Sequence, residues 1–426
     1  MLYHLFDWLR ANDMKVPGGA LFLFITFRML LAVLLSLIIT TVFGKRLINY
    51  LRKKQVGESV RDLGLAGEQQ KKGTPTMGGL VILLAILIPT LLLADLNKVY
   101  IRLMIFSTIW LGIVGFIDDY LKLRAKRLAQ EQGIPYKKGD KDGLAGWFKV
   151  LGQVVLGIVV SAVILFSPNA KAYREYSGAG LPADTVNMKR VPWNDRERIF
   201  VEAKEPISTI PFVKTHEFNY SKLLPAAVRG LTWVLYMLIV IFIITAVSNG
   251  ANITDGLDGL ATGVSAIIGV CLGVFAYASG NLRLADYLNI MYIPNLAELS
   301  IFIGAMVGAC VGFLWYNSYP AQVFMGDTGS LALGGMIASL AIIVRKELLI
   351  PIFCGVFLVE SLSVVLQVSY FKYTKKKYGE GRRIFLMSPL HHHYQKLGYH
   401  ESKIVTRFWI VTILCVVFSI VTLKIR

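Results

Sequence analysis

The 426-residue chain is poor in charged residues and especially poor in acidic ones. Charged side chains make up 17% of the sequence and apolar ones 55%, whereas soluble globular proteins carry about 25% charged residues. This balance excludes a disordered or fibrous chain, argues against a water-soluble domain and leaves a membrane protein with several spans. The 27 Asp and Glu stand against 45 Lys and Arg, a net charge of +18. In a soluble protein this excess would indicate nucleic acid, but in a membrane protein it first reports topology.

Three further absences narrow the function classes. No C-x-x-C pair is present, and the four cysteines all lie in apolar runs, which is typical of buried, unpaired thiols. No G-x-x-x-x-G-K-[ST] sequence occurs, so a P-loop nucleotide site is excluded. Residues 1–19 carry charges of both signs before a long apolar run, and no small-residue cleavage site follows, so we expect no cleaved signal peptide.

Long apolar runs are what the sequence does contain. Because a helix needs about 20 apolar residues to cross the bilayer core, the sequence predicts one all-α membrane domain over residues 1–426 with ten transmembrane helices. The predicted spans are 20–43, 77–94, 99–117, 147–166, 229–248, 260–279, 299–315, 331–344, 347–371 and 404–423. An even number of spans places both termini on one side of the membrane.

Lys and Arg are distributed unevenly among the predicted loops. Loops 44–76, 118–146 and 372–403 hold 23 of the 45 cations, whereas the short loops on the other side hold one or two each. The positive-inside rule therefore predicts that these three loops are cytoplasmic and that both termini are extracytoplasmic.

Residues 167–228 form the long extracytoplasmic loop. Nine Lys and Arg are offset there by seven Asp and Glu, and six prolines punctuate the segment. We expect a small extracytoplasmic insertion with short strands and without a catalytic cluster. Deletion of 170–222 is expected to spare catalysis.

Five aspartates lie at the cytoplasmic ends of predicted spans. Asp118 and Asp119 belong to GFIDDY (115–120), Asp255 and Asp258 to NITDGLDGLA (252–261), and Asp327 to WYNSYPAQVFMGDTGS (315–330). Carboxylates at a membrane surface are costly unless they are paired, hydrated or metal-bound, and oxygen-rich clusters suit Mg²⁺. With Lys and Arg around them they predict phosphoryl-transfer or diphosphate chemistry. Each Asp taken alone is also compatible with a helix N-cap, and it is their arrival from three places on one face that favours a site.

Three other motifs leave alternatives open. The segment KKGTPTMGG (71–79) precedes the second span, where its lysines either hold a phosphate at the helix start or face anionic lipid. The histidine run in SPLHHHYQKLG (388–398) favours phosphate or sugar contact over zinc, since three consecutive side chains cannot face one way on a helix. Glu360 lies inside the ninth apolar span and is either functional or a hydrated structural acid.

Together the five motifs resemble those of the polyprenyl-phosphate N-acetylhexosamine-1-phosphate transferases. The uninterrupted histidine run is similar to that of the phospho-N-acetylmuramoyl-pentapeptide transferases within this family. The resemblance covers residues 20–426 apart from loop 167–228, which is longer than in the commonest members. It implies an enzyme of the bacterial inner (plasma) membrane, with its active site on the cytoplasmic face and a broken ninth helix beside a groove for the lipid tail.

The reaction implied by the resemblance transfers phospho-MurNAc-pentapeptide from UDP-MurNAc-pentapeptide to undecaprenyl phosphate. It uses Mg²⁺, forms lipid I and UMP, and is the first membrane step of peptidoglycan synthesis. The implied partners are these two substrates, inner-membrane lipids and a second copy of the chain in a homodimer, without nucleic acid. We expect a single displacement with inversion at phosphorus, and a phospho-Asp327 intermediate is the alternative.

The resemblance also implies roles for individual residues. Asp327 would bind Mg²⁺, and Asp118 of the pair Asp118 and Asp119 would act as general base on the lipid phosphate. His391, His392 and His393 would act near the sugar phosphate or the diphosphate. The positions implied near the nucleotide are Lys71, Thr76, Asn252, Asp255, Gly256, Leu257, Asp258, Asn317 and Phe324.

Two other functions remain open on the residues alone. A multipass transporter would suit the glycines, a broken span and Glu360, but transporter sites lie at the membrane midplane rather than at one face. A UDP-GlcNAc phosphotransferase is the alternative within the enzyme class.

Overall fold

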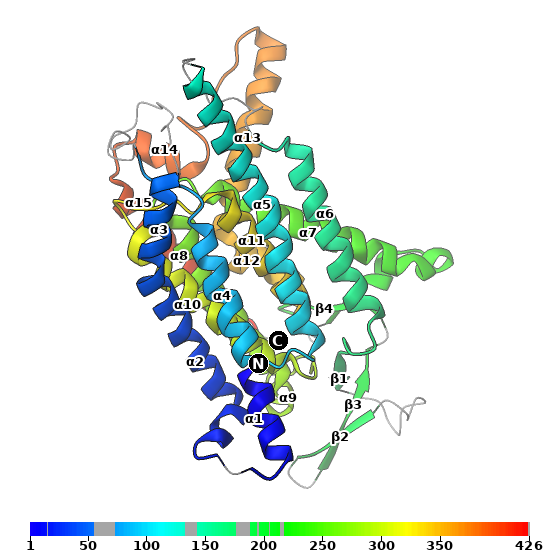
Figure 1. Ribbon diagram of the computed structural model, residues 1–426. Helices are drawn as coiled ribbons and strands as arrows, with labels where there is room; N and C mark the ends of the chain where they lie inside the picture. The colour runs from blue at the N-terminus through cyan, green and yellow to red at the C-terminus, as the bar shows by residue number, and fades with distance from the viewer. Residues whose placement is uncertain are drawn as a thin grey trace.

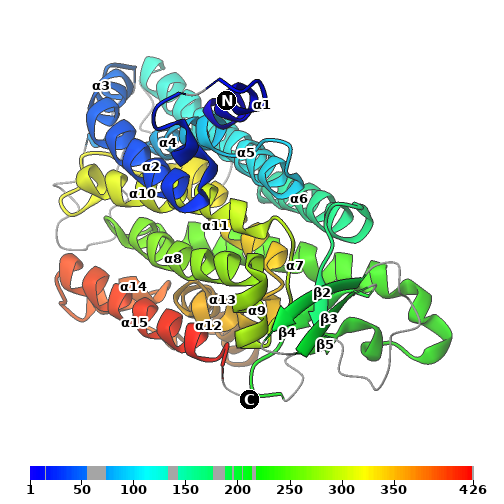
Figure 2. The ribbon, with the colours of Figure 1, turned by 90° about the horizontal axis from the view of Figure 1, so that it is seen from below.

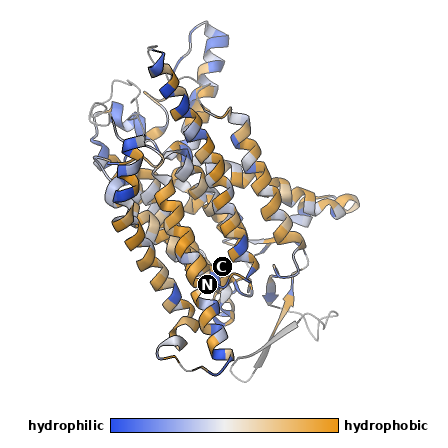
Figure 3. Ribbon diagram, in the orientation of Figure 1, coloured by the Kyte–Doolittle hydropathy of each residue, from blue (hydrophilic) through white to orange (hydrophobic). Residues whose placement is uncertain are grey.

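The computed structural model describes residues 1–14, 16–54, 73–132, 143–175, 188–193, 196–203, 205–213 and 217–424. This part of the chain is helical apart from five short strands, which confirms the predicted all-α membrane class. Figures 1 and 3 show a bundle of apolar helices whose polar residues collect toward the two ends. The four cysteines are unpaired, and Cys271, Cys310 and Cys354 are buried as predicted, whereas Cys415 is partly exposed.

Nine described helices are long and apolar enough to cross a membrane. The shorter apolar helix α4 lies at the second predicted span, so each of the ten predicted spans corresponds to a helical segment. In chain order these helices are α2 (Ile25–Ile38) with its continuation α3 (Gly44–Lys54), α4 (Gly79–Leu93), α5 (Val99–Glu131), α6 (Gly146–Phe166), α7 (Thr232–Thr254), α8 (Leu260–Gly280), α10 (Leu299–Asn317), α11 (Gly326–Ile343), α13 (Gly355–Tyr378) and α15 (Glu401–Val421).

Several predicted boundaries differ from the observed ones where the site lies. α5 continues to Glu131, so Asp118 and Asp119 lie within a helix rather than at its end. α11 begins at Gly326, which places Asp327 in its first turn rather than in the preceding loop. The ninth span is interrupted, because the short helix α12 (Ile350–Phe353) ends just before α13 begins. Hydropathy predicts where a chain leaves the lipid, whereas backbone hydrogen bonds can continue a helix beyond that point.

α11 lies at the centre of the bundle, and 89% of its apolar window is buried inside the protein. Seen from below, α5, α7, α8 and α10 lie around it (Figure 2). Its small residues permit this position: a methyl group on Gly334 would meet Ser248 Cα of α7 at 2.6 Å, and one on Gly335 would meet Leu111 of α5 at 2.2 Å. Small residues favour close packing in membranes, where van der Waals contact drives helix association.

Both termini lie at one end of the bundle, as the even number of spans predicts. The N-terminal ammonium, at the start of α1 (Leu2–Ala11), donates to the Leu91 carbonyl near the end of α4 (2.6 Å). Near the C-terminus, Lys424 Nζ donates to the Tyr287 carbonyl of α9 (Leu282–Leu288) at 2.5 Å. The opposite end of α4 adjoins the start of α11, where Gly79 N donates to the Met325 carbonyl (2.8 Å). The termini are therefore far from Asp327.

The insertion 167–228 contains the five described strands. β1 (Tyr173–Glu175), β3 (Arg196–Glu202) and β2 (Met188–Trp193) form an antiparallel sheet in the order β1-β3-β2. β4 (Ile207–Thr209) pairs with β5 (Glu217–Asn219). The strands lie toward the end of the bundle that holds the termini (Figure 1).

β4 is fixed to the segment between α11 and α12 by a buried polar network. Ser208 Oγ donates to Glu347 Oε2 (2.5 Å), Lys346 Nζ donates to Thr209 Oγ1 (2.7 Å), and Thr209 N donates to the Arg345 carbonyl (2.9 Å). Deletion of 170–222 would leave the buried Lys346 and Glu347 without these partners. The deletion is therefore expected to lower the stability of the fold, and the expectation that it spares catalysis stays a prediction.

Candidate active site

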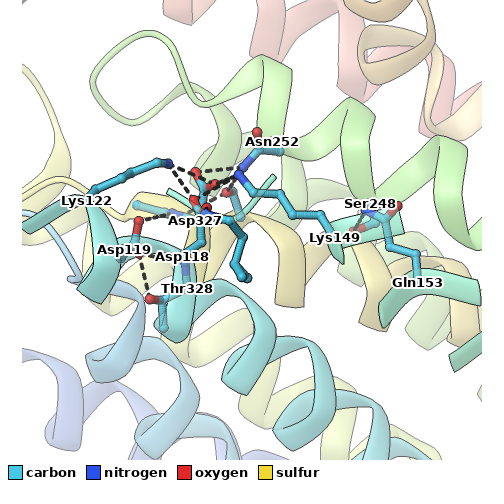
Figure 4. A network of polar contacts seen from close by, with 12 residues as sticks. Asp118, Asp119, Lys122, Lys149, Gln153, Ser248, Asn252, Asp327 and Thr328 are labelled. Carbon is cyan, nitrogen blue, oxygen red and sulfur yellow. Dashed lines mark hydrogen bonds and ion pairs between the residues drawn. The ribbon is translucent and has the colours of Figure 1, made fainter. Parts of the chain in front are cut away.

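Three aspartates from two helices meet in one polar network (Figure 4), which lies at the end of the bundle opposite the termini. Asp118 and Asp119 come from α5 and Asp327 from α11, and one oxygen of each lies within 4.8 Å of the others. A close helix crossing makes this possible, because a methyl group on Gly115 would meet the Asp327 carbonyl oxygen at 2.2 Å. Gly115 thus lets α5 approach the start of α11 closely enough for the carboxylates to meet.

Asp119 caps the start of α11. Its Oδ1 accepts from Asp327 N (3.1 Å), and its Oδ2 accepts from Thr328 N (2.9 Å) and Thr328 Oγ1 (2.6 Å). The first amides of a helix have no partner within the helix, and a carboxylate supplies one. Asp119 is buried and both its oxygens are engaged, so it holds Asp327 in place, and one of its oxygens also belongs to the close carboxylate group.

Asp118 and Asp327 share two lysines. Lys122 Nζ lies 2.6 Å from Asp118 Oδ2 and 3.1 Å from Asp327 Oδ2, and Lys149 Nζ lies 2.8 Å and 2.5 Å from the same oxygens. Asp118 Oδ1 accepts from Leu144 N (2.7 Å), and its side chain is fully buried. Asp327 exposes 16% of its side chain, Lys149 20% and Lys122 35%. The accessible side of the cluster is therefore formed by Asp327 and the two lysines.

Neither lysine was predicted as a site residue. Lys122 is one cation among seven in a basic loop, and it lies one helical turn after Asp118 only because α5 continues. Lys149 gave a clearer signal, since it is an isolated cation near the start of an otherwise apolar span. Ionisable residues in apolar spans are functional candidates, and Lys149 meets this criterion as Glu360 does.

Asn252 and Thr76, two of the positions predicted near the nucleotide, lie beside the cluster. Asn252 Nδ2 donates to Asp327 Oδ1 (3.0 Å) and to Ser330 Oγ (2.8 Å). Thr76 adjoins Gly326, where an added methyl group would lie 2.9 Å from Thr76 Oγ1. Lys71 lies outside the described residues, so the structure does not place it.

Asp258 and Asn317 connect loops, and both are buried. Asp258 Oδ2 accepts from Ala321 N (3.0 Å), while Asn317 Oδ1 accepts from Gly259 N (3.1 Å) and its Nδ2 donates to the Val323 carbonyl (2.9 Å). These contacts join the loop after α7 to the loop before α11.

The other predicted nucleotide positions lie in the same two loops. Leu257 is buried, and Phe324 contributes backbone bonds to the segment before α4, its N donating to the Pro75 carbonyl and its carbonyl accepting from Gly78 N (2.9 Å each). Asp255 and Asp258 do not belong to the carboxylate group formed by the described residues. Among the described residues three of the five aspartates form this close group, while Asp255 and Asp258 follow the turn of α7 whose Asn252 donates to Asp327 and so lie at the same end of the bundle.

The three histidines have different surroundings. His391 is fully buried, and its Nδ1 lies 3.0 Å from Glu360 Oε2. His392 and His393 are partly exposed, and His393 Nδ1 accepts from Leu386 N (3.1 Å). As expected for consecutive residues, they do not share one face. Glu360 is therefore a paired acid rather than a hydrated one.

The donor set fits Mg²⁺. The carboxylates of Asp118 and Asp327 supply the hard oxygen ligands that this ion prefers, and Asp327 is the more accessible of the two. Three carboxylates facing two ammonium groups leave one excess negative charge. A bound divalent cation would make the net charge of this cluster positive, and a positive cluster suits an anionic diphosphate.

The helical bundle and its terminal cluster define a membrane-bound glycosyl transferase, since the family model "Glycosyl transferase family 4" matches residues 101–345. Phospho-N-acetylmuramoyl-pentapeptide-transferase signature 1 matches residues 71–83. Relatives named phospho-N-acetylmuramoyl-pentapeptide-transferase include those of Flavobacterium johnsoniae (55% identical), Flavobacterium psychrophilum (56%) and Amoebophilus asiaticus (53%), each with 100% of both chains covered. The chain belongs to the phospho-N-acetylmuramoyl-pentapeptide-transferase family, which confirms the resemblance found in its motifs.

Proposed function

We propose that the protein transfers phospho-MurNAc-pentapeptide from UDP-MurNAc-pentapeptide to undecaprenyl phosphate, forming lipid I and UMP. Family membership over the whole chain supports this reaction. The observation that carries it is the cluster in which Asp118 and Asp327 share Lys122 and Lys149. A reaction between two phosphate-bearing substrates requires positive charge at the site. Two ammonium groups that can turn from the carboxylates to phosphate oxygens, and carboxylates that can hold a cation, supply it.

The two lysines reduce the repulsion between the reactants. The attacking lipid phosphate and the nucleotide diphosphate are both anionic, so they approach only where positive charge is provided. We propose that Lys122 and Lys149 turn from the carboxylates to the phosphate oxygens when substrate binds. Mg²⁺, held by Asp327 with Asp118 beside it, would supply further positive charge to the departing phosphate of UMP.

The reaction is proposed to be one displacement at phosphorus. A lipid phosphate oxygen forms a bond to the sugar-linked phosphorus, the bond from that phosphorus to the bridging oxygen breaks, and its electron pair leaves with UMP. A phosphate monoester has a second pKa of about 6, so only a minority of lipid phosphates keep the last proton at neutral pH. Asp118, released by the lysines, accepts that proton, and Asp119 positions Asp327. Net retention at phosphorus would instead support a phospho-Asp327 route.

The remaining assignments are proposed from membership of the family. The nucleotide is proposed to lie along Lys71, Thr76, Asn252 and residues 255–258, with Asn317 and Phe324 supporting that loop. His392 and His393 are proposed to contact the sugar phosphate or diphosphate. The cation-rich loops at the cluster's end of the bundle support a cytoplasmic active site and extracytoplasmic termini in a bacterial inner membrane. We also propose that the protein acts as a homodimer.

Metal removal tests the proposed chemistry. In purified protein supplied with both substrates, a chelator should abolish UMP release, and Mg²⁺ should restore it. Asp327→Asn should remain inactive at every Mg²⁺ concentration, because it lacks a charged ligand. Full activity in the chelator, or recovery of Asp327→Asn to the wild-type rate, would contradict the proposal.

A further inference from the structure

Glu360 and His391 form a buried pair that the proposed chemistry does not use. Glu360 belongs to α13, after the interruption of the ninth span, and His391 to α14 (Leu390–Lys396). Both side chains are fully buried, and His391 Nδ1 lies 3.0 Å from Glu360 Oε2. Their other polar atoms, Glu360 Oε1 and His391 Nε2, are buried without a hydrogen-bond partner among the described residues. Such atoms destabilise a fold, so stability alone does not account for the pair.

The far edge of the His391 ring packs against Gly256. A methyl group added to Gly256 would lie 2.2 Å from His391 Nε2 and 2.8 Å from its Cε1. Gly256 is not among the glycines with positive φ, so the position requires glycine for space rather than for backbone conformation. His391 therefore rests on the backbone of residues 255–259, the loop that joins α7 to α8.

The helix turn that precedes this loop contacts the aspartate cluster, and the loop itself contacts the segment before α11. Asn252, in the last turn of α7, donates to Asp327 Oδ1 (3.0 Å), and Asp258 accepts from Ala321 N (3.0 Å). A displacement of His391 would thus move a loop that directly follows the turn holding Asp327 and that carries four of the proposed nucleotide positions, residues 255–258.

We propose that Glu360 is a positioning residue that holds His391 against Gly256 and so sets loop 255–259 for the nucleotide substrate. The carboxylate accepts from Nδ1–H, and in the neutral imidazole this leaves the Nε2 lone pair directed at the loop. The pair thereby links the interrupted ninth span to the nucleotide site. The part of this inference that concerns the nucleotide rests on the proposed function, whereas the packing does not.

Thermal unfolding in detergent tests the packing without reference to catalysis. Gly256→Ala inserts a methyl group into the His391 ring and should lower Tm, and so should His391→Ala, which leaves Glu360 unpaired. Together the two changes should lower Tm by less than the sum of their separate effects, because the ring that clashes is gone. Gly230→Ala, whose methyl group would meet nothing within 4 Å, is the control and should leave Tm unchanged. Additive losses would overturn the contact.

Kinetics distinguish a positioning role from a catalytic one. Glu360→Ala should raise KM for UDP-MurNAc-pentapeptide by about tenfold or more, with kcat and KM for undecaprenyl phosphate changed by less than about threefold. Glu360→Gln keeps an oxygen that can accept from Nδ1–H and should recover most of the loss. The exposed Glu380→Gln is the matched control.

The opposite kinetic pattern would overturn the positioning role. A fall in kcat of about a hundredfold with KM unchanged would identify a group acting in the transition state. Absence of UMP release by the wild-type protein would refute the proposed function, and the unfolding measurement would still decide whether His391 packs on Gly256.

Discussion

Replacement of Lys149 by methionine removes one ammonium group from the aspartate cluster while keeping a side chain of similar length. Lys149 Nζ lies 2.5 Å from Asp327 Oδ2 and 2.8 Å from Asp118 Oδ2, so its loss leaves the three carboxylates facing Lys122. At an effective dielectric constant of about 20, one unit charge acting over about 4 Å contributes about 4 kcal/mol. Because Lys149 is 20% exposed, solvent reduces this effect. We therefore expect the barrier to rise by about 3 kcal/mol, or roughly a hundredfold in kcat/KM.

Initial rates of UMP release, with each substrate varied at saturating Mg²⁺, measure this effect. Lys149→Arg keeps the charge and should lose less activity than Lys149→Met. The control is Lys403→Met on α15, whose exposed ammonium lies 5.6 Å from the centre of the Tyr399 ring and should be dispensable. If Lys149→Met keeps more than about a third of wild-type kcat/KM, its activation free energy differs from that of the wild type by under about 1 kcal/mol. In that case the proposed role of the Lys149 charge is refuted. It is refuted equally if Lys403→Met loses as much.

Three further outcomes are expected. Asp118→Asn should impair UMP release most near pH 6, where the lipid phosphate keeps more of its last proton, and a deficit that stays constant up to about pH 9 would exclude the base role. Ser208→Ala removes a donor from the buried Glu347 and should lower the free energy of unfolding by about 1.5–3 kcal/mol. It should leave kcat/KM unchanged at a permissive temperature, and an unaltered Tm would contradict the anchoring of the insertion. Burial lowers the pKa of Lys346 from 10.5 to about 7, so the folded protein releases this proton at a lower pH than the unfolded chain does. The free energy of unfolding should therefore rise from about pH 7 to about pH 10.5, and Lys346→Met should flatten that rise in thermal scans; equal pH dependence in both proteins would refute the assignment.

The architecture of the bundle could be predicted because it depends on properties that are local in the sequence. Apolar runs predicted ten helical spans, and the even count placed both termini at one end, as observed. The family-specific motifs predicted the transferase family to which the chain belongs, and the family model and the signature that match the chain confirm it. Asp327 and Asn252, which belong to two of these motifs, lie within hydrogen-bond distance of each other.

The finer composition of the site depends on packing and could not be predicted in this way. The meeting of Asp118 with Asp327 relies on the close crossing at Gly115, and the capping role of Asp119 relies on where α11 begins. Lys149 reaches the cluster from a third helix, at a distance in sequence that no short motif spans. Hydropathy alone does not define these contacts.

The anchoring of the insertion was also beyond prediction. β4 lies far in sequence from Lys346 and Glu347, and two adjacent residues of opposite charge resemble a short hydrophilic turn between spans. In the folded protein this turn is buried, so its charged side chains require hydrogen-bond partners, and β4 supplies them.

The choice between two nucleotide sugars decides whether the protein catalyses the proposed reaction. Purified protein with undecaprenyl phosphate and Mg²⁺ would be offered UDP-MurNAc-pentapeptide and UDP-GlcNAc in separate reactions, with UMP and the lipid product identified by mass spectrometry. We predict UMP together with undecaprenyl-diphospho-MurNAc-pentapeptide from the first nucleotide sugar, and neither UMP nor a lipid product from the second. Turnover of UDP-GlcNAc alone would contradict the account.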